Sequence, residues 1–243
     1  MPADMAGIFI RLTGDTRADI PPALPNVAKQ SMKNVLVLGA NGQIARWVIA
    51  ALTDRNDVFL TLLQRNPNKL TGWEPANGQV VIGNVLDRKL LRAAMTGQDI
   101  VYANLIGEDL DIQATRVIEA MQSAGVKRLV FVLSLGIYDE VPGQFGQWNN
   151  ATIGNDLQPY RRAADAIERS GLDYTILRPA WLTDEHEVDY EITTKTDPFK
   201  GTVVSRKSVA DLIGKIITSP DLHLGGNLGV NKPGSDGDKP HFM

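Results

Sequence analysis

The sequence predicts an α/β protein whose core is a doubly wound parallel sheet. From Lys33 onward, short apolar runs alternate with segments of helical spacing, as expected when parallel strands are joined by crossover helices. A glycine-containing turn directly follows the first of these runs, at a position where such a sheet binds its ligand. The composition, with 43% hydrophobic and 22% charged residues among 243, is typical of a globular protein.

Strands are predicted where short runs of aliphatic and β-branched residues occur. Residues 35–38 form a continuous apolar run, which is typical of a strand covered on both faces. Residues 128–133 are the most strand-like run of the chain. The other expected strands span residues 58–63, 80–82, 100–103 and 174–177.

Helices are predicted between the strands, where apolar residues recur at helical spacing. They are expected over residues 44–52, 90–95, 114–121, 157–167 and 209–217. Gly125 stands just past the third of these, where a left-handed C-cap is common, and Gly171 and Pro220 follow the last two. Because ligands bind at the carboxyl ends of the strands in such sheets, functional residues are expected directly after each strand.

Residues 1–32 lack this rhythm, because four prolines interrupt them and no periodicity runs for two turns. We expect an N-terminal extension with little fixed structure over 1–32 and a single domain over 33–243. Met32 stands directly before the first strong element. The extension is therefore either a segment upstream of another start or a genuine arm.

Composition and charge exclude several classes of function. The net charge of −3 gives no broad cationic field, so no nucleic-acid partner is expected. The apolar stretch at residues 6–10 is too short for a signal peptide or a membrane span, so no membrane association is expected. The absence of cysteine permits a reducing compartment, and the cytoplasm is the simplest choice of location. His186 lies among acidic residues without metal-ligand spacing, so no metal site is predicted.

The turn after the first strand has the pattern Gly-x-x-Gly and leads into a helix. It consists of Gly39, Ala40, Asn41, Gly42, Gln43 and Ile44. The glycines let a ligand approach the backbone closely, and the amides that open the helix favour an anion such as a diphosphate. Strand, turn and helix occur in the order that dinucleotide binding requires, although a plain tight turn is the alternative.

The second strand is followed by Arg65, and the acidic residue that would hold a ribose 2′-hydroxyl is missing. An arginine there is placed to form charge-assisted hydrogen bonds with a 2′-phosphate. NADP(H) is therefore the preferred cofactor, with NAD(H) as the second choice. The alternative is that Arg65 is a solvated surface residue.

Two further strand ends offer candidates for the cofactor. Asn84 and Val85 follow the third strand, where they are expected to cover the adenine. Asn104 and Leu105 follow the fourth strand, where the chain passes between the two halves of a dinucleotide. A buried structural role is the alternative for Asn104.

The ends of the fifth and sixth strands make a family resemblance specific. They read Leu-Ser134-Leu-Gly and Arg178-Pro179-Ala180. With the Gly39 turn and Asn84, they resemble an atypical short-chain dehydrogenase/reductase of the NmrA-like NAD(P)-binding group over residues 33–243. The resemblance implies a Rossmann sheet of about seven parallel strands, bound NADP(H) and a small C-terminal substrate region. It also implies that Ser134 polarises a substrate carbonyl and that the Arg-Pro-Ala turn lies beside the nicotinamide.

The chain departs from this family at the proton donor. Conventional members use Tyr-x-x-x-Lys, and none of the five tyrosines here is followed by lysine at that spacing. Arg161 takes the place of the lysine, where it can hydrogen-bond the nicotinamide ribose but cannot shuttle protons. Tyr138 and Tyr160 are the candidate donors, with packing or gating as the alternative for each and water as another proton source.

Residues 141–155 mix aromatic and flexible side chains after the fifth strand. We expect a loop that closes over the substrate as a lid, or else a surface loop pinned by Trp148. Trp181 and the segment to Ile192 are expected to form the facing wall, which suits a small uncharged substrate.

The sequence thus favours an NADP(H)-dependent reductase of a small carbonyl, quinone or similar acceptor. The main alternative is a non-catalytic NADP(H) sensor that binds a regulatory protein partner, motivated by the missing Tyr-x-x-x-Lys pair. A nucleotide-sugar epimerase is a lesser alternative, because the C-terminal portion is short. The substrate and the oligomeric state stay open.

Overall fold

The computed structural model describes residues 32–66 and 75–243, so the predicted N-terminal extension lies outside the described residues except for Met32. The strands are β1 (Lys33–Leu38), β2 (Val58–Gln64), β3 (Gly78–Ile82), β4 (Ile100–Ala103), β5 (Arg128–Val132), β6 (Asp173–Pro179), β7 (Trp181–Thr183), β8 (Glu191–Thr193), β9 (Val203–Ser205) and β10 (Gly226–Asn231). The helices are α1 (Gln43–Leu52), α2 (Arg88–Met95), α3 (Leu110–Ala124), α4 (Gly143–Ile153), α5 (Leu157–Glu168) and α6 (Arg206–Thr218), with a short 3₁₀ helix η2 (Gly154–Asp156).

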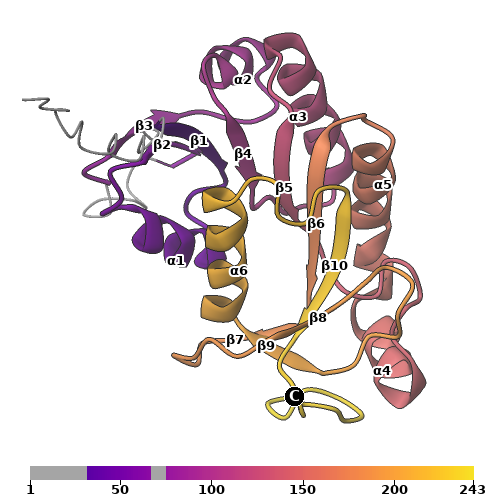
Figure 1. Cartoon of the computed structure of the whole chain (residues 1–243). Helices are drawn as coiled ribbons and strands as arrows, with labels where there is room; N and C mark the ends of the chain where they lie inside the picture. The colour runs from indigo at the N-terminus through magenta and orange to yellow at the C-terminus, as the bar shows by residue number, and fades with distance from the viewer. Residues whose placement is uncertain (1–31, 67–74) are drawn as a thin grey trace, which may run out of the picture. The chain divides into compact units, whose positions relative to one another are not determined.

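An eight-stranded sheet forms the centre of the described chain, in the order β3-β2-β1-β4-β5-β6-β10-β8 (Figure 1). The strands from β3 to β10 run parallel, and β8 is antiparallel to β10. The strand order reverses at β1, as it does in a doubly wound sheet. The predicted fold class is therefore confirmed.

The registers bring the carboxyl ends of the central strands together. Leu38, the last residue of β1, pairs with Leu63 near the end of β2 and with Ala103 at the end of β4. Residues that follow these strands therefore meet at one edge of the sheet, beside the point where the strand order reverses.

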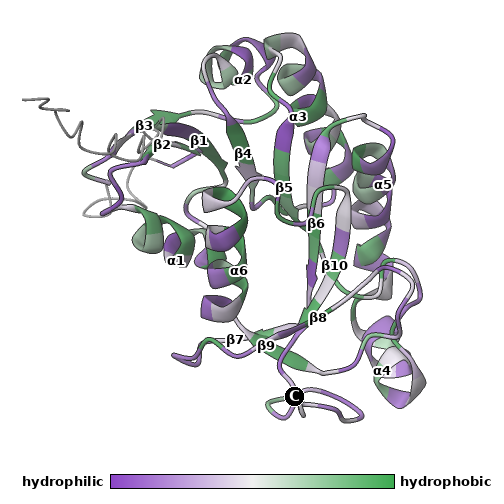
Figure 2. Ribbon diagram, in the orientation of Figure 1, coloured by the Kyte–Doolittle hydropathy of each residue, from purple (hydrophilic) through white to green (hydrophobic). Residues whose placement is uncertain are grey.

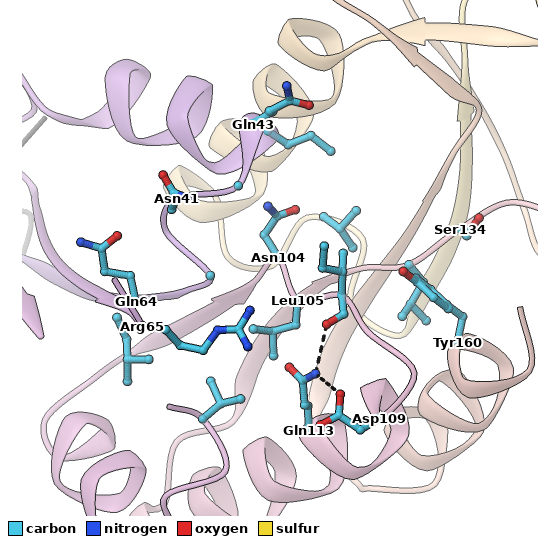
Figure 3. Close-up of a pocket in the computed structure, with 18 of the residues that line it drawn as sticks. Asn41, Gln43, Gln64, Arg65, Asn104, Leu105, Asp109, Gln113, Ser134 and Tyr160 are labelled. Atoms are coloured by element: carbon cyan, nitrogen blue, oxygen red, sulfur yellow. Dashed lines mark hydrogen bonds between the residues drawn. The ribbon is translucent and has the colours of Figure 1, made fainter. Parts of the chain in front are cut away.

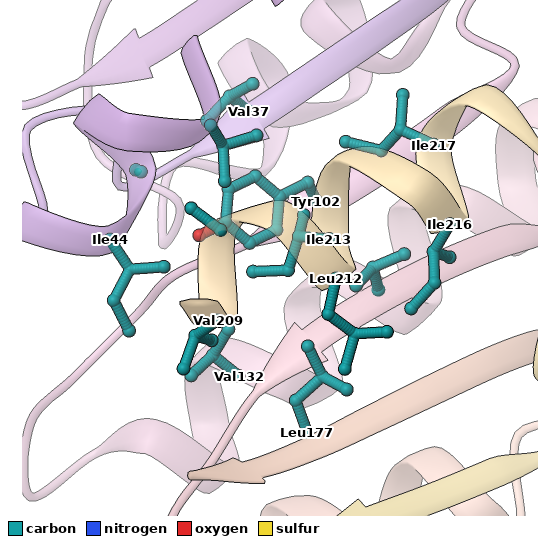
Figure 4. Packing of buried hydrophobic residues seen from close by; sticks show 14 of the residues in the cluster. Val37, Ile44, Tyr102, Val132, Leu177, Val209, Leu212, Ile213, Ile216 and Ile217 are labelled. Carbon is teal, nitrogen blue, oxygen red and sulfur yellow. The ribbon is translucent and has the colours of Figure 1, made fainter. Parts of the chain in front are cut away.

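Two apolar layers cover the sheet, because successive residues of a strand point to opposite faces. In β1, Val35 and Val37 belong to the layer under α1 and α6, whereas Leu36 and Leu38 belong to the layer under α2, α3 and α5. Figure 4 shows the first layer, where strand side chains pack against α6. Because β1 is covered on both faces, its residues are apolar in a continuous run. Figure 2 shows that the neighbouring strands β4 and β5 are also mainly hydrophobic.

The prediction of a loop over residues 141–155 is wrong, because α4 and η2 form in this segment. Gly146 and the paired asparagines give this segment low helix propensity, so the helix depends on tertiary contacts. Phe145 is buried, and the Nε1 of Trp181 donates a hydrogen bond to Oδ1 of Asn149 at 2.9 Å. The ring centroids of Trp148 and Trp181 are 4.9 Å apart, so α4 is held against β7.

The strand β10 was not predicted, because its sequence Gly-Asn-Leu-Gly-Val-Asn has low strand propensity. It is nevertheless almost entirely buried between β6 and β8. A Cβ at Gly229 would lie 2.8 Å from Cε2 of Phe199, so close packing requires glycine there. The three-residue β8 then ends the sheet.

Candidate functional site

A pocket of about 900 Å³ lies where the carboxyl ends of β1 to β6 meet. Figure 3 shows Gln64 and Arg65 toward one end of the pocket and Ser134 and Tyr160 toward the other, with Asn104 between them. The pocket therefore spans the crevice that doubly wound sheets use for extended ligands.

The glycine turn forms one wall of the pocket. Gly39 has a φ of +75°, in the left-handed region that favours glycine, and its amide donates to the carbonyl of Leu63 at 3.1 Å. A Cβ at Gly39 would strike the carbonyl of Asn104, and one at Gly42 would strike the Asn104 side-chain amide. Both positions therefore require glycine for the turn to pack this closely against Asn104.

The helix α1 begins directly after this turn, and Gln43 and Ile44 line the pocket. The first amides of a helix have no intrahelical acceptor, and the helix dipole makes this end electropositive. No acidic side chain occupies the first turn, and the N-cap residue Gly42 offers no side-chain acceptor. The wall is therefore suited to a diphosphate.

The end of β2 contributes two polar side chains. Arg65 is exposed at the pocket and forms no ion pair with any described residue. Gln64 is only 4% exposed, yet neither its Nε2 nor its Oε1 has a hydrogen-bond partner in the described structure. A buried amide without partners costs about 1 to 3 kcal/mol, which a hydrogen-bonding ligand would offset. Gln64 was missed as a site residue, although a polar residue ending an apolar strand was a signal.

The middle of the pocket is held by short-range hydrogen bonds. The Asn84 Oδ1 accepts from the Leu86 amide at 3.1 Å, which fixes the turn after β3, and Val85 lines the pocket beside it. The Nε2 of Gln113 donates to the Asp109 carboxylate at 2.7 Å and to the Ile106 carbonyl at 3.1 Å (Figure 3).

The other end of the pocket is largely apolar but carries two hydroxyl groups. Ser134 follows β5 and donates a hydrogen bond to the Leu135 carbonyl at 3.2 Å. Tyr160 extends from α5, where burial and the carboxylate of Asp156 one turn earlier raise the pKa of its phenol. Its phenol therefore stays protonated at neutral pH. Apolar walls around the two hydroxyls come from Ile153, Leu157, Pro179 and Leu182.

Most of the predicted site residues therefore come together in one pocket. They are Gly39, Asn41, Gly42, Gln43, Ile44, Arg65, Asn84, Val85, Asn104, Leu105, Ser134, Tyr160 and Pro179. Ala40 and Ala180 lie in the core instead, and their amides are occupied by the carbonyls of Leu63 and Val230. These two predicted cofactor-binding residues therefore do not line the pocket.

The predicted site residues Tyr138, Arg161 and Arg178 also do not line the pocket. They belong to a polar cluster between α5 and the β10 side of the sheet, which we call the Tyr138 cluster. Its members are Tyr138, Glu140, Arg161, Glu168, Arg178, Lys195 and Asn227.

Inside this cluster, hydrogen bonds and ion pairs satisfy the polar groups. The Tyr138 hydroxyl donates to Glu168 at 3.2 Å and accepts from Asn227 at 2.8 Å. Burial and the nearby charge of Glu168 raise the pKa of this phenol. Arg178 is fully buried, pairs with Glu140 and donates from Nε to Asn227 at 2.8 Å. The Arg161 guanidinium lies 4.7 Å from the Tyr138 ring centroid. The spacing of Arg161 along its helix did not reveal that it faces this ring.

Within residues 32–66 and 75–243, no group of three potential ligands is arranged to hold a metal ion. The His186 ring instead packs edge-on against Trp47, with centroids 4.8 Å apart. No helix of this part of the chain is both long and apolar enough to cross a membrane.

The glycine cradle, the electropositive start of α1 and the unpartnered Gln64 fit a dinucleotide, and the fold and site define a Rossmann-type NAD(P)-binding protein. The profile of the NAD(P)H-binding family matches residues 39–220, so the chain belongs to this family. The expected resemblance to atypical short-chain dehydrogenases/reductases and the expected NAD(P)H-type cofactor are thereby confirmed.

Individual relatives agree with this family. A Shigella flexneri Rossmann-fold NAD(P)-binding family protein is 58% identical, with a TM-score of 0.77 over 87% of this chain and 100% of that one. A Veillonella parvula short-chain dehydrogenase/reductase in complex with NADP is 28% identical, with a TM-score of 0.76 over 86% of this chain and 99% of that one. A Bacillus subtilis protein described as an uncharacterised sugar epimerase, YhfK, is 31% identical over 167 residues, which are 62% of this chain and 73% of that protein.

Proposed function

We propose that the protein is an NADP(H)-dependent reductase of a small carbonyl, quinone or similar acceptor. The observation that carries the proposal is that one continuous pocket joins the diphosphate wall at α1 to the hydroxyls of Ser134 and Tyr160. An oxidoreductase of this family needs both parts, because the cofactor must be held while its reactive ring faces an acceptor.

Cofactor binding is assigned to the walls near β1, β2 and β3. The first amides of α1 bind the diphosphate, and the exposed guanidinium of Arg65 pairs with a 2′-phosphate. Gln64 then donates a hydrogen bond to an adjacent ribose or phosphate oxygen, which satisfies its buried amide. Asn84 and Val85 flank the adenine. The Veillonella parvula relative in complex with NADP supports this preference.

The chemical step is assigned to the other end of the pocket. When bound, the reduced nicotinamide would supply a hydride to the acceptor. Ser134 and Tyr160 hold the acceptor oxygen with their hydroxyls, and Tyr160 donates the proton. Because the pKa of this phenol is raised and no lysine takes part, Tyr160 is a weak acid, and we expect slow turnover.

The test separates binding from turnover. NADPH and NADH are titrated into the full chain by calorimetry, and NADPH oxidation is then followed with aldehyde, ketone and quinone acceptors. We expect tighter binding of NADPH than of NADH and measurable oxidation. Failure to bind either dinucleotide contradicts the proposal, whereas tight binding without turnover favours a sensor that recognises a regulatory protein.

A further inference from the structure

Arg206 lies on the pocket wall, and one N–H donor of its side chain has no hydrogen-bond partner among the described residues. It is the first residue of α6 and lines the pocket with Gln43 and Leu182. Its side chain is 17% exposed, and its Nε is buried without a hydrogen-bond partner. Its Nη1 donates to Asp184 at 2.9 Å and reaches the Leu182 carbonyl at 3.4 Å. Sequence reasoning assigned no role to Arg206.

The counterion of Arg206 is weakly held, because the Asp184 side chain is 78% exposed. Ion pairs with such an exposed partner contribute about 0 to 1 kcal/mol, since water solvates the carboxylate almost as well. The guanidinium itself is mostly withdrawn from water, which makes it a better partner for a ligand charge than a surface arginine. A pocket anion can therefore compete with Asp184.

An unpaired Nε alone does not identify a binding site. Arg128 also has a buried Nε without a partner, but its two terminal nitrogens donate to four acceptors within the fold and it does not line the pocket. All three side-chain nitrogens of Arg178 donate hydrogen bonds within the protein, to Asn227, Glu140 and the Thr194 carbonyl. Arg206 differs from both, because it combines an unsatisfied donor, a solvated counterion and a place on the pocket wall.

We propose that Arg206 binds an oxyanion in the pocket, a carboxylate or phosphate group that competes with Asp184 for the charge of the guanidinium. A guanidinium offers planar pairs of N–H donors, which such groups can bind in bidentate fashion. This inference rests on the proposed function. The anion is either an acidic group of the substrate or the diphosphate of the dinucleotide, since Arg206 shares the wall with Gln43 at the start of α1.

The test uses variants at both ends of the ion pair. Arg206→Gln removes the charge, and Arg206→Lys keeps the charge but loses the planar fork. Asp184→Asn removes the competing carboxylate from an exposed position, so it tests the inference even if Arg206→Gln folds poorly. Arg162→Gln is the matched control, because it breaks a surface ion pair of 2.6 Å with Asp111, and neither residue lines the pocket.

Two binding assays distinguish the sources of the anion. NADPH is titrated into each full-length variant by calorimetry, and benzoate and neutral benzamide are titrated into the NADP-saturated proteins. If the diphosphate is the ligand, Arg206→Gln weakens NADPH binding by about ten-fold or more, as expected for a charge-assisted hydrogen bond. If a substrate carboxylate is the ligand, Arg206→Gln leaves NADPH binding unchanged and weakens benzoate by a similar factor without affecting benzamide.

Asp184→Asn should change the affinity for the anion in the opposite direction to Arg206→Gln. Removal of the competitor should strengthen binding of the same anion by about two- to five-fold, the range expected for an exposed pair. The inference is overturned if Arg206→Gln matches wild type in both assays, or if Asp184→Asn leaves binding unchanged or weaker. Wild-type protein that binds no dinucleotide at all would contradict the proposed function instead.

Discussion

The pocket and the Tyr138 cluster both gather polar side chains beside the sheet, but they differ in how fully those groups are paired. In the Tyr138 cluster, each buried side-chain donor and acceptor has a partner inside the protein. In the pocket, Gln64 and the Nε of Arg206 have none among the described residues. Buried polar groups in a folded protein are normally paired. The contrast favours a stabilising role for the cluster, and it supports the proposal that ligands complete the pocket.

The largest expected effect tests the cluster. Glu140→Gln removes the charge that faces the fully buried Arg178, and we expect a loss of about 3 to 5 kcal/mol in the free energy of unfolding. Denaturant melts measure this loss. NADPH affinity of the folded fraction should stay at the wild-type value, and a selective loss of NADPH binding would contradict the separation of the two regions.

The next effect tests the reactive end of the pocket. Tyr160→Phe removes the proposed proton donor, so kcat for NADPH oxidation should fall by about 100-fold with the NADPH dissociation constant unchanged. Tyr138→Phe is the control, because its hydroxyl is paired with Glu168 outside the pocket. Equal losses of kcat in the two variants would remove the functional distinction between these tyrosines.

A somewhat smaller effect is expected at the cofactor end. Arg65→Glu replaces the cation proposed to hold the 2′-phosphate, and we expect NADPH binding to weaken by about 10- to 100-fold. NADH lacks that phosphate and should bind the variant about as well as the wild type. Calorimetric titration with both dinucleotides measures the change in preference. If the ratio of the NADPH and NADH dissociation constants is unaltered, Arg65 is a solvated surface residue that does not bind the cofactor.

The smallest effect concerns acid stability. Burial raises the pKa of Glu168, but hydrogen bonds from Lys195 and Asn227 outweigh it and lower the pKa below its ordinary value. Stability from this carboxylate is thus present above the ordinary value and lost as the pH falls through the lowered one. Glu168→Gln should flatten the dependence of stability on pH in this acidic range. Urea melts at several acidic pH values measure it, and an identical slope would contradict the assignment.

Local patterns were sufficient to predict the parallel core. The apolar run at residues 35–38 and the glycine turn after it depend on short-range chemistry, and both lie where they were expected. Gly125 adopts a φ of +73° at the end of α3, as a left-handed C-cap requires. These elements were predictable because burial on both faces requires a continuous apolar run, and a left-handed backbone conformation favours glycine.

Features that depend on contacts between distant residues could not be predicted from local sequence patterns. The helix α4 is held by Trp181, which lies 32 residues beyond Asn149. Neighbouring positions also separated unexpectedly, since Tyr160 lines the pocket while Arg161 lies over the Tyr138 ring. A helix turns by about 100° per residue, so sequence spacing alone did not identify which side faced the ligand. The place of Arg206 on the pocket wall, on which its proposed role depends, likewise follows only from the position of α6 beside the pocket.

The strand β8 has a consequence for assembly. It exposes an edge only three residues long, and its Glu191 pairs with Lys200 at 3.4 Å beside that edge. Short edge strands that carry charge offer few free backbone groups to an incoming chain. This border of the sheet therefore discourages the addition of a strand from another chain.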